Sequence, residues 1–559
     1  MVGGFYYTID VAMDENTIFQ GPQVPSQPQS TVPAQNPAGS TPSIPMQPIT
    51  PVTPPRPIST AQPRMPSPAP STPPVSSVSP PPPTSPPTPG GAAGPAAPVT
   101  TSFPPPPPPI VSSAPSTGAK ASGFGVPLGG ILKAVIGLIL LLVVGFLIFG
   151  VVVPGFFSTK NEKVTLTYWG LWEDPRVIQK VIDDFQKENK NLTVKYEKQD
   201  IKDQYRDRLL TRIANGSGPD IFQFHNSWLW GMKDVLTAFP TDVITPGEFK
   251  KAYFPVVVND VTQNGAIYGV PLQMDTLALF TNTDMLEASS LTPPTNWEDF
   301  GKAARTLTVK DENGKIKTAG AALGTYYNIT HAPDIISLLF LQNGANIYDL
   351  SATAQQSTDT LNYYTQDYAL GDSNVWDTTL DPSLLAFTKG NLAMYFGYSW
   401  DIFAISAMNP QLHFQVSPVP HLPLGRKVTI ASYWVEGVSQ KSKHQKEAML
   451  FMKFLTRKET LEKLFNEASK TRAFGELYPR QDLVETLKDN KLLYPFVAQA
   501  ANAASSFFVS DTYDNGLNEK ANGYLGTAVR SMLESTSAET ALESLSAGVS
   551  AALKKYGQQ

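Results

Sequence analysis

The 559-residue chain contains no cysteine. Disulfide bonds, thiol nucleophiles, thiolate metal sites and lipid attachment through an N-terminal cysteine are therefore excluded. Histidine is scarce as well, and the five histidines show no spacing that indicates a metal site. The sequence also lacks a nucleophile elbow, a zinc motif and a phosphate-binding loop. We therefore expect no cofactor, no bound metal and no catalytic residue.

Charge is nearly absent from the first part of the chain. Within residues 21–120 the only charges before the terminal Lys120 are Arg56 and Arg64, and most of the 52 prolines lie in the same stretch. Its apolar residues are too sparse to repay the entropy of ordering, so we predict a disordered tail with extended polyproline segments. We favour a passive linker over bait for proline-reading domains. Residues 1–20 form a separate short segment without an assigned role.

Polar side chains are absent from Ala134 to Val153. As a helix this run reaches about 30 Å, the thickness of the hydrocarbon core of a bilayer, so we predict a transmembrane helix within residues 131–154. A signal peptide would lie at the extreme N-terminus with a shorter apolar run, and a buried core helix would show a polar face. Two lysines precede the run and two follow it, so flanking charge does not set the orientation.

The chain from Lys160 onward has a different composition. It carries all eight tryptophans and nearly all of the charge. The negative balance of this part, within a formal net charge of −5, argues against nucleic acid as a partner. Its length is sufficient for two lobes, each with its own core.

Strand and helix patterns alternate at the start of this part. A strand is expected over Val164–Trp169, an amphipathic helix from Pro175, and a second strand over Leu192–Tyr196. A helix over 204–214 and a third strand over 220–224 follow. This order is typical of a parallel sheet covered by helices, whose ligands bind beyond the carboxyl ends of the strands.

Four candidate ligand-binding residues come directly after these strands. Trp172 and Glu173 follow the first strand, and Asn226 and Trp228 follow the third. Further along, a helix over 444–468 is expected, as is a last helix that begins at a capping box of Thr536 and Glu539. The sequence "DENGK" before residue 316 lacks the ligands of an EF-hand and predicts a hairpin turn.

Six successive motifs carry a family resemblance. They include "VTLTYWGLWEDP", "IANGSGPDIFQFHNSW", "AIYGVPLQMDTLALFTNTDML" and "FTKGNLAMYFGYSWDIFAIS". In order and spacing they resemble the extracellular solute-binding proteins of ABC importers, in the maltose-binding-protein-like family, over roughly Lys163 to Gly557. The resemblance implies an α/β, two-lobed clamp of the type II periplasmic-binding-protein-like class over residues 162–559. Lobe 1 would comprise about 162–275 and 432–480, and lobe 2 about 276–431 and 481–559.

The resemblance also implies a function and a location. Members of the family hold a small solute in the cleft and deliver it to ABC permease subunits. The domain would therefore lie outside a cell membrane that the chain crosses once, with the proline-rich tail in the cytoplasm. A membrane-anchored glycan-active enzyme and a receptor that signals through its own tail remain as alternatives.

Residue by residue, the motifs suggest positions for the ligand contacts. Asp275 matches a cleft carboxylate of the family and Trp400 a sugar-stacking aromatic residue. Asn226 takes the position at which maltose binders have an acidic residue, so the resemblance does not imply specificity for maltodextrin. The stretch "EASKTRAFGELYPR" departs from the family's short turn, so Arg472 is assigned no contact. The complete set of expected ligand-binding residues is Trp172, Glu173, Asn226, Trp228, Asp275, Tyr327, Trp400, Trp434 and Glu436.

The residue types favour a carbohydrate. A sugar offers apolar CH faces and a rim of hydroxyl groups, so its site needs aromatic platforms flanked by carboxylates and amides. Asp275 either bonds the ligand or caps a backbone amide, and we favour the ligand. Trp297 and Trp376 are expected to pack in the core.

Overall fold

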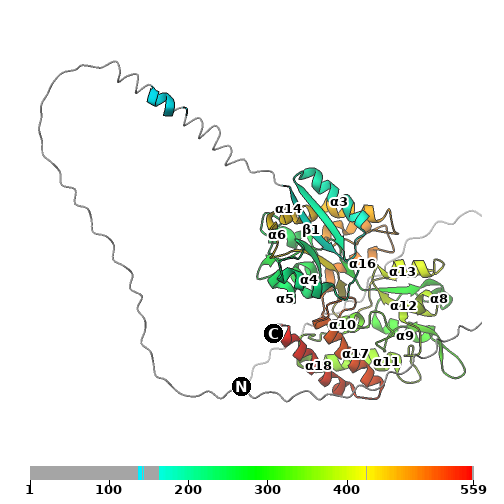
Figure 1. Ribbon diagram of the computed structural model, residues 1–559. Coiled ribbons are helices and arrows are strands. Elements are labelled where there is room, and N and C mark those ends of the chain that lie inside the picture. The colour runs from blue at the N-terminus through cyan, green and yellow to red at the C-terminus, as the bar shows by residue number, and fades with distance from the viewer. Residues whose placement is uncertain (1–135, 142, 144–162, 423–424, 557–559) are drawn as a thin grey trace, which may run out of the picture. The chain divides into compact units, whose positions relative to one another are not determined.

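The computed structural model describes residues 136–141, 143, 163–422 and 425–556 (Figure 1). The predicted tail over 21–120 and the segment 1–20 lie outside the described residues, and so does most of the predicted span over 131–154. Within the described ranges, no helix has both the length and the apolar character needed to cross a bilayer.

The first lobe is built on a four-stranded sheet in the order β13-β3-β1-β2. Strand β1 (Val164–Gly170) runs parallel to β2 (Leu192–Lys198) and β3 (Ile221–His225), whereas β13 (Trp434–Val438) is antiparallel to β3. The parallel strands were predicted from the sequence, and the antiparallel edge strand comes from a segment more than 200 residues further along the chain. Apolar side chains at successive positions of β3 are buried because helices cover the sheet.

Helix α3 (Pro175–Glu188) shows how local sequence builds this lobe. Asp174 accepts a hydrogen bond from the N–H of Arg176 at the helix start, and proline occupies the first turn. The apolar positions Val177, Ile178, Val181, Ile182 and Phe185 form one buried stripe, as the periodicity predicts. The lobe also contains α4 (Tyr205–Ala214), α5 (Leu229–Met232), α6 (Pro246–Ala252), α7 (Pro255–Val261), the hairpin β4 (Thr262–Gln263) and β5 (Ala266–Ile267), α14 (Gln445–Leu455) and α15 (Lys458–Ala468).

The second lobe holds a five-stranded sheet in the order β11-β7-β10-β9-β8. Its strands are β7 (Ala278–Asn282), β8 (Val309–Lys310), β9 (Ile316–Ala321), β10 (Leu392–Gly397) and β11 (Phe414–Ser417). Its helices are α8 (Thr283–Ala288), α9 (Trp297–Leu307), α10 (Ala332–Gln342), α11 (Ala354–Ala369), α12 (Ser383–Thr388), α13 (Asp401–Met408), α17 (Leu517–Leu533) and α18 (Ala538–Lys555). Trp297 and Trp376 are buried here, as predicted.

Three chain segments connect the lobes. They meet in a small sheet in which β12 (Thr429–Ser432) lies between β6 (Asp275–Thr276) and β14 (Ala503–Ala504). The short helix α16 (Tyr494–Ala498) packs against β6 (Figure 1). Chain crossings of this kind allow two lobes to move about a shared hinge.

Two predicted boundaries are wrong. The helix expected over 444–468 is two helices, because Thr456 caps α14 and the backbone of Arg457 is extended before α15 begins. The last helix is capped by Ser537 instead of Thr536, since the N–H of Thr536 bonds back to Ser531 at the end of α17. The predicted hairpin turn is confirmed: Asp311 accepts hydrogen bonds from the N–H groups of Asn313 and Lys315 between β8 and β9.

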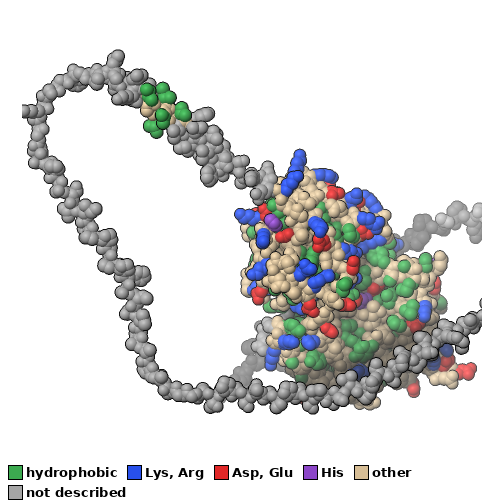
Figure 2. Space-filling model, viewed as in Figure 1, with side chains coloured by type: hydrophobic (Ala, Val, Ile, Leu, Met, Phe, Trp, Pro, Cys, Tyr) green, Lys and Arg blue, Asp and Glu red, His purple; other side chains and the backbone are tan. Residues whose placement is uncertain are grey.

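Charges of both signs are distributed over the face shown in Figure 2, where Lys and Arg side chains alternate with Asp and Glu. This face therefore offers no continuous basic surface.

Candidate ligand-binding cleft

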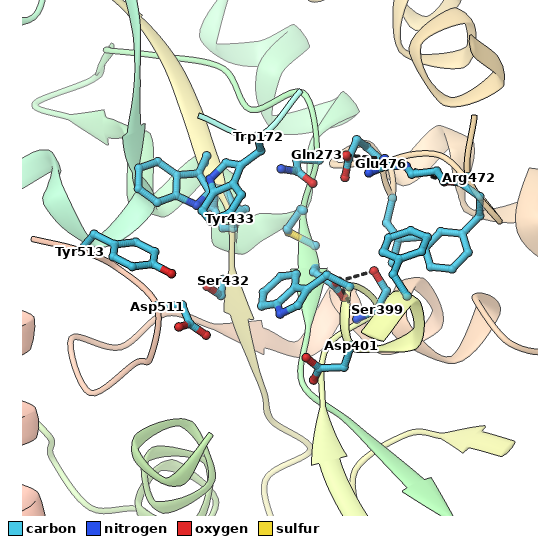
Figure 3. A pocket seen from close by; sticks show the side chains of 17 residues that line it. Trp172, Gln273, Ser399, Asp401, Ser432, Tyr433, Arg472, Glu476, Asp511 and Tyr513 are labelled. Atoms are coloured by element: carbon cyan, nitrogen blue, oxygen red, sulfur yellow. Dashed lines mark hydrogen bonds and ion pairs between the residues drawn. The ribbon is translucent and has the colours of Figure 1, made fainter. Parts of the chain in front are cut away.

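A cavity of about 380 Å³ lies between the two lobes, beside the crossing segments (Figure 3). Seven aromatic side chains, a guanidinium group and four carboxyl groups contribute to its walls. Residues from lobe 1, lobe 2 and all three crossings meet there: Trp172, Gln273, Asp275, Ser399, Trp400, Asp401, Phe403, Ser432, Tyr433, Trp434, Arg472, Phe474, Glu476, Asp511 and Tyr513.

Indole rings form the wall on the side of lobe 1. The ring of Trp172, just after β1, lies 5.8 Å from that of Trp434, which in turn lies 5.1 Å from Trp228. The Nζ atom of Lys202 is 3.5 Å from the Trp172 ring centroid, a cation–π contact that occupies one face of this indole. A ligand therefore has only the remaining surface of Trp172 available.

Trp400 forms the opposite wall, directly after β10. Its indole stacks on the buried ring of Tyr398, with centroids 4.3 Å apart and an interplanar angle of 16°. The Tyr398 hydroxyl donates a 2.6 Å hydrogen bond to Asp334, which fixes the supporting ring. Trp400 keeps 36% of its surface exposed, so it presents a rigid, accessible aromatic face to the cavity.

Asp275 lies at the first crossing and lines the cavity, but its oxygen atoms are already bonded to protein. Oδ1 accepts the N–H of Thr276 at 2.8 Å, and Oδ2 accepts the N–H of Ser399 at 2.8 Å and the Ser399 hydroxyl. Burial raises the pKa of Asp275 to about 7. In the structure this carboxyl group caps backbone amides and ties the crossing to lobe 2, while the ligand contact favoured from the sequence stays a prediction.

The third crossing brings two polar residues into the cavity. Asp511 and Tyr513 both have left-handed backbone conformations, with φ of 56° and 52°. The Tyr513 ring lies 6.2 Å from Trp172 in lobe 1. Asp511 also contributes to the lining of the cavity (Figure 3). Left-handed conformations of such residues cost free energy and concentrate at ligand sites.

Arg472 and its neighbours form the remaining wall, in the segment that follows α15. Arg472 donates a hydrogen bond to Glu476, and its guanidinium lies 5.1 Å from the ring of Phe403 on α13. The same Phe403 ring stacks on Phe474. Lobe 1 and lobe 2 are therefore in direct contact at this side of the cavity.

Two buried acids lie behind the aromatic wall of lobe 1. The amide nitrogen of Gln223 donates to Glu173 at 2.9 Å and to Glu436 at 2.8 Å, and the Tyr168 hydroxyl also donates to Glu436. Burial, together with the charge of Glu476, raises the pKa of Glu173 to about 7. Burial and the charge of Glu173 raise the pKa of Glu436 above its ordinary value.

The nine residues predicted from the sequence thus fall into three groups. Four of them line the cavity, namely Trp172, Asp275, Trp400 and Trp434, while Glu173 and Glu436 lie behind its wall. The other three are Asn226, which bonds Asp260 and Ser505, Trp228, which is buried among aromatic rings, and Tyr327, which is 71% exposed outside the cavity.

Several cavity residues escaped prediction. Arg472, Phe474 and Glu476 lie in the stretch that departs from the family pattern, and Asp511 and Tyr513 lie in a segment without strand or helix periodicity. An aromatic residue between two acids in "SDTYDNG", just before α17, was the one signal present in the sequence for the latter pair.

The cavity is suited to binding a polyhydroxylated ligand. Both lobes contribute aromatic side chains to its lining, which also includes carboxyl, amide and hydroxyl groups. Among the described residues, no cluster of His, Asp and Glu has an arrangement that would hold a metal ion.

Comparison with known proteins identifies relatives over most of the folded chain. The family model described as bacterial extracellular solute-binding protein matches residues 169–462, more than half of the chain. A multiple sugar-binding protein of Streptococcus mutans is 24% identical over 379 residues, which cover 64% of this chain and 87% of the relative.

Two solved structures share the fold. A cyclo/maltodextrin-binding protein complexed with maltotetraose aligns with a TM-score of 0.56 and 17% identity, covering 71% of this chain and 99% of the other. A cyclic alpha-maltosyl-1,6-maltose binding protein from Arthrobacter globiformis aligns with a TM-score of 0.57 and 18% identity, covering 70% and 99%. At these identities the likeness shows the two-lobed fold.

Proposed function

We propose that this chain captures a sugar or oligosaccharide and delivers it to an ABC importer. The chain belongs to the family of bacterial extracellular solute-binding proteins, which makes it a binding protein and not an enzyme. The sugar is inferred from one observation: Trp172 of lobe 1 and Trp400 of lobe 2 line the same cavity together with polar side chains. Sugar rings stack on indoles through their CH faces while their hydroxyl groups bond the polar rim.

The names of related proteins support the same ligand class. The relative from Streptococcus mutans is named as a sugar-binding protein, and both structural neighbours are binding proteins for glucose oligomers. The cavity volume of about 380 Å³ lies within the range of small-molecule sites. A short oligosaccharide that contacts both lobes would bind the closed state more tightly than the open state. It would therefore shift the protein toward the closed state.

The sequence supports a membrane location for this binding protein. The apolar run from Ala134 to Val153 would anchor the chain, with the solute-binding domain outside the cell and the proline-rich tail inside. Protease added to intact cells should then remove the domain and spare the tail. A domain that stays intact in whole cells, but is cleaved after lysis, would contradict this location.

Ligand identity is tested by a thermal-shift screen of the full-length chain. The panel consists of glucose, maltose, maltotetraose, raffinose and mannotriose, with spermidine and calcium as ligands of other classes. A ligand at one hundred times its Kd stabilises the folded state by about 2.7 kcal/mol, a readily measured shift. Stabilisation by at least one sugar, lost in Trp400→Ala, supports the proposal. Stabilisation by spermidine or calcium alone would contradict it.

A further inference from the structure

One buried hydrogen-bond network supports two walls of the cavity at once. His331 occupies its centre, immediately before α10, and is 1% exposed. Its Nε2 lies 2.9 Å from Oδ2 of Asp401, and its Nδ1 lies 2.9 Å from the hydroxyl of Ser510. Asp401 is a cavity residue at the start of α13, and Ser510 directly precedes the cavity residue Asp511.

Each partner of His331 is held by a further bond. The N–H of Ser510 donates to Oδ2 of Asp334 at 3.0 Å, so two contacts fix the backbone immediately before Asp511. The other oxygen of Asp334 accepts the hydroxyl of Tyr398, on which Trp400 stacks. The indole of Trp400 and the carboxylate of Asp511 therefore rest on the same buried groups, although 111 residues separate them in the chain.

The electrostatics of the network favour a charged imidazole. Burial by itself lowers the pKa of His331, but the carboxylates of Asp401, Asp334 and Asp511 outweigh burial and raise this pKa to about 9. The remaining titratable groups that face the ring are Tyr395 and Tyr398, whose pKa values burial raises above the ordinary value, so both stay neutral. At neutral pH both ring nitrogens of His331 are donors, one toward Asp401 and one toward Ser510.

We propose that His331 is a positioning residue of the ligand site, which orients the Asp511 carboxylate through Ser510 and the loop that carries Trp400 through Asp401. Asp511 becomes a ligand-contacting acid under this assignment, and the left-handed backbone that presents it is maintained by the bonds to Ser510. The inference rests on the proposed function, since it concerns how the same cleft recognises its ligand.

Loss of the proton from His331 removes one of the two donors and the positive charge among three carboxylates. The hydrogen bond to Ser510 then reverses, with the Ser510 hydroxyl donating to the bare Nδ1, and the Asp511 carboxylate loses the positive charge that holds it. We therefore expect the position of Asp511, and with it the affinity for ligand, to depend on pH with the titration of His331.

The first test needs no ligand. Hydrogen–deuterium exchange of the full-length chain is followed by mass spectrometry in His331→Gln, Ser510→Ala and the control His413→Gln, whose imidazole is exposed on the surface of lobe 2. We expect residues 508–513 to exchange at least tenfold faster in His331→Gln and severalfold faster in Ser510→Ala, with β10 and α17 unchanged. In the parent chain the protection factor of this segment should fall as the pH passes about 9.

The second test measures the affinity for maltotetraose by calorimetry between pH 6 and 10. The Kd of the parent should rise severalfold across the alkaline half of this range. In His331→Gln the Kd should be at least tenfold higher at pH 7 and independent of pH. A purely structural role would lower the melting temperature without removing the pH dependence.

Several results would overturn the assignment. It fails if exchange over 508–513 in His331→Gln equals that of the parent, or if the pH profile of the variant matches the parent's. If His331→Gln does not fold, Ser510→Ala decides, because it keeps the His331–Asp401 pair and removes only the contact to the crossing. If no sugar of the thermal-shift panel binds the parent, the ligand class of the proposed function is contradicted, while the exchange test still decides the role of His331.

Discussion

Phe403 of lobe 2 stacks on Phe474 of lobe 1 across the mouth of the cleft, with ring centroids 4.4 Å apart and planes 24° apart. An aromatic pair contributes about 0.5–1.5 kcal/mol beyond its buried area, so this contact stabilises the arrangement in which the lobes meet. We expect Phe403→Ala to shift the ligand-free protein toward an open state. Small-angle scattering should then show a larger radius of gyration, which added ligand reduces.

A matched control for this change is Phe414→Ala. Phe414 stacks on Phe280 within lobe 2, so its loss should lower the melting temperature without altering the radius of gyration. Equal scattering curves for Phe403→Ala and the parent would show that the stack does not hold the lobes together.

Trp400 and Tyr327 were both expected from the sequence to bind the ligand, but Trp400 lines the cavity and Tyr327 does not. Trp400→Ala should weaken sugar binding by about 2–4 kcal/mol, the range of a hot-spot aromatic residue, because the ligand loses its stacking face. Tyr327→Ala should leave the affinity unchanged, since Tyr327 does not line the cavity. Titration calorimetry with the sugar found in the screen measures both, and the reverse pattern would place the site elsewhere.

We expect Asp275→Ala to lower the free energy of unfolding. The change leaves the N–H groups of Thr276 and Ser399 without their acceptor in a buried setting, which costs about 1–3 kcal/mol of unfolding free energy. Urea unfolding monitored by tryptophan fluorescence measures this loss. Ser399→Ala removes only the hydroxyl donor and should cost less. If Asp275→Ala leaves the unfolding curve unchanged but abolishes ligand binding, Asp275 contacts the ligand directly, as the sequence predicted.

Stability should decrease as the pH rises from about 4.5 to about 7. Burial raises the pKa of Glu173 to about 7 from an ordinary value near 4.5, so in this window the folded chain binds more protons than the unfolded chain. The free energy of unfolding therefore falls with increasing pH, and Asp275 contributes in the same direction. Glu173→Gln should make the decline shallower in urea titrations at each pH.

A surface acid serves as the control for this pH dependence. Lys470 lowers the pKa of Glu467 by hydrogen bonding, so Glu467 is ionised in both the folded and the unfolded chain between pH 5 and 7. Glu467→Gln should therefore leave the slope of the unfolding free energy against pH as it is in the parent. An identical slope in Glu173→Gln would mean that Glu173 ionises as readily in the folded chain as in the unfolded one.

Local patterns were sufficient to predict the first three strands and first two helices of lobe 1. The bounds of β1, α3 and β3 follow from alternation, a proline at the helix start and a buried apolar run. Trp172 was found because it follows a strand, where the end of a sheet places side chains at a cleft, and Trp400 because it matches a sugar-stacking residue of the family.

Long-range bonds explain what the sequence did not predict. Asp511 reaches the cavity because Ser510 bonds Asp334 across 176 residues of sequence, a contact that no local pattern encodes. Asn226 was expected in the cavity from its position after β3, but its side chain is occupied by Asp260 and Ser505, which belong to segments far apart in the chain. Whether an acid or an amide faces a ligand depends on such competing partners.

The burial of Glu173 and Glu436, which share the amide of Gln223, also determines how the folded chain behaves in an electric field. Among the described residues no cation bonds either acid, and burial keeps a proton on the pair at pH values where both acids would be ionised in an unfolded chain. Asp260 and Asp275 retain protons for the same reason, and the buried neutral His225 offsets only one of them. The native protein should therefore carry less negative charge near pH 6 than its composition implies. It should focus at a higher isoelectric point than the same chain in urea, and unfolding in weakly buffered solution should release protons and acidify the medium.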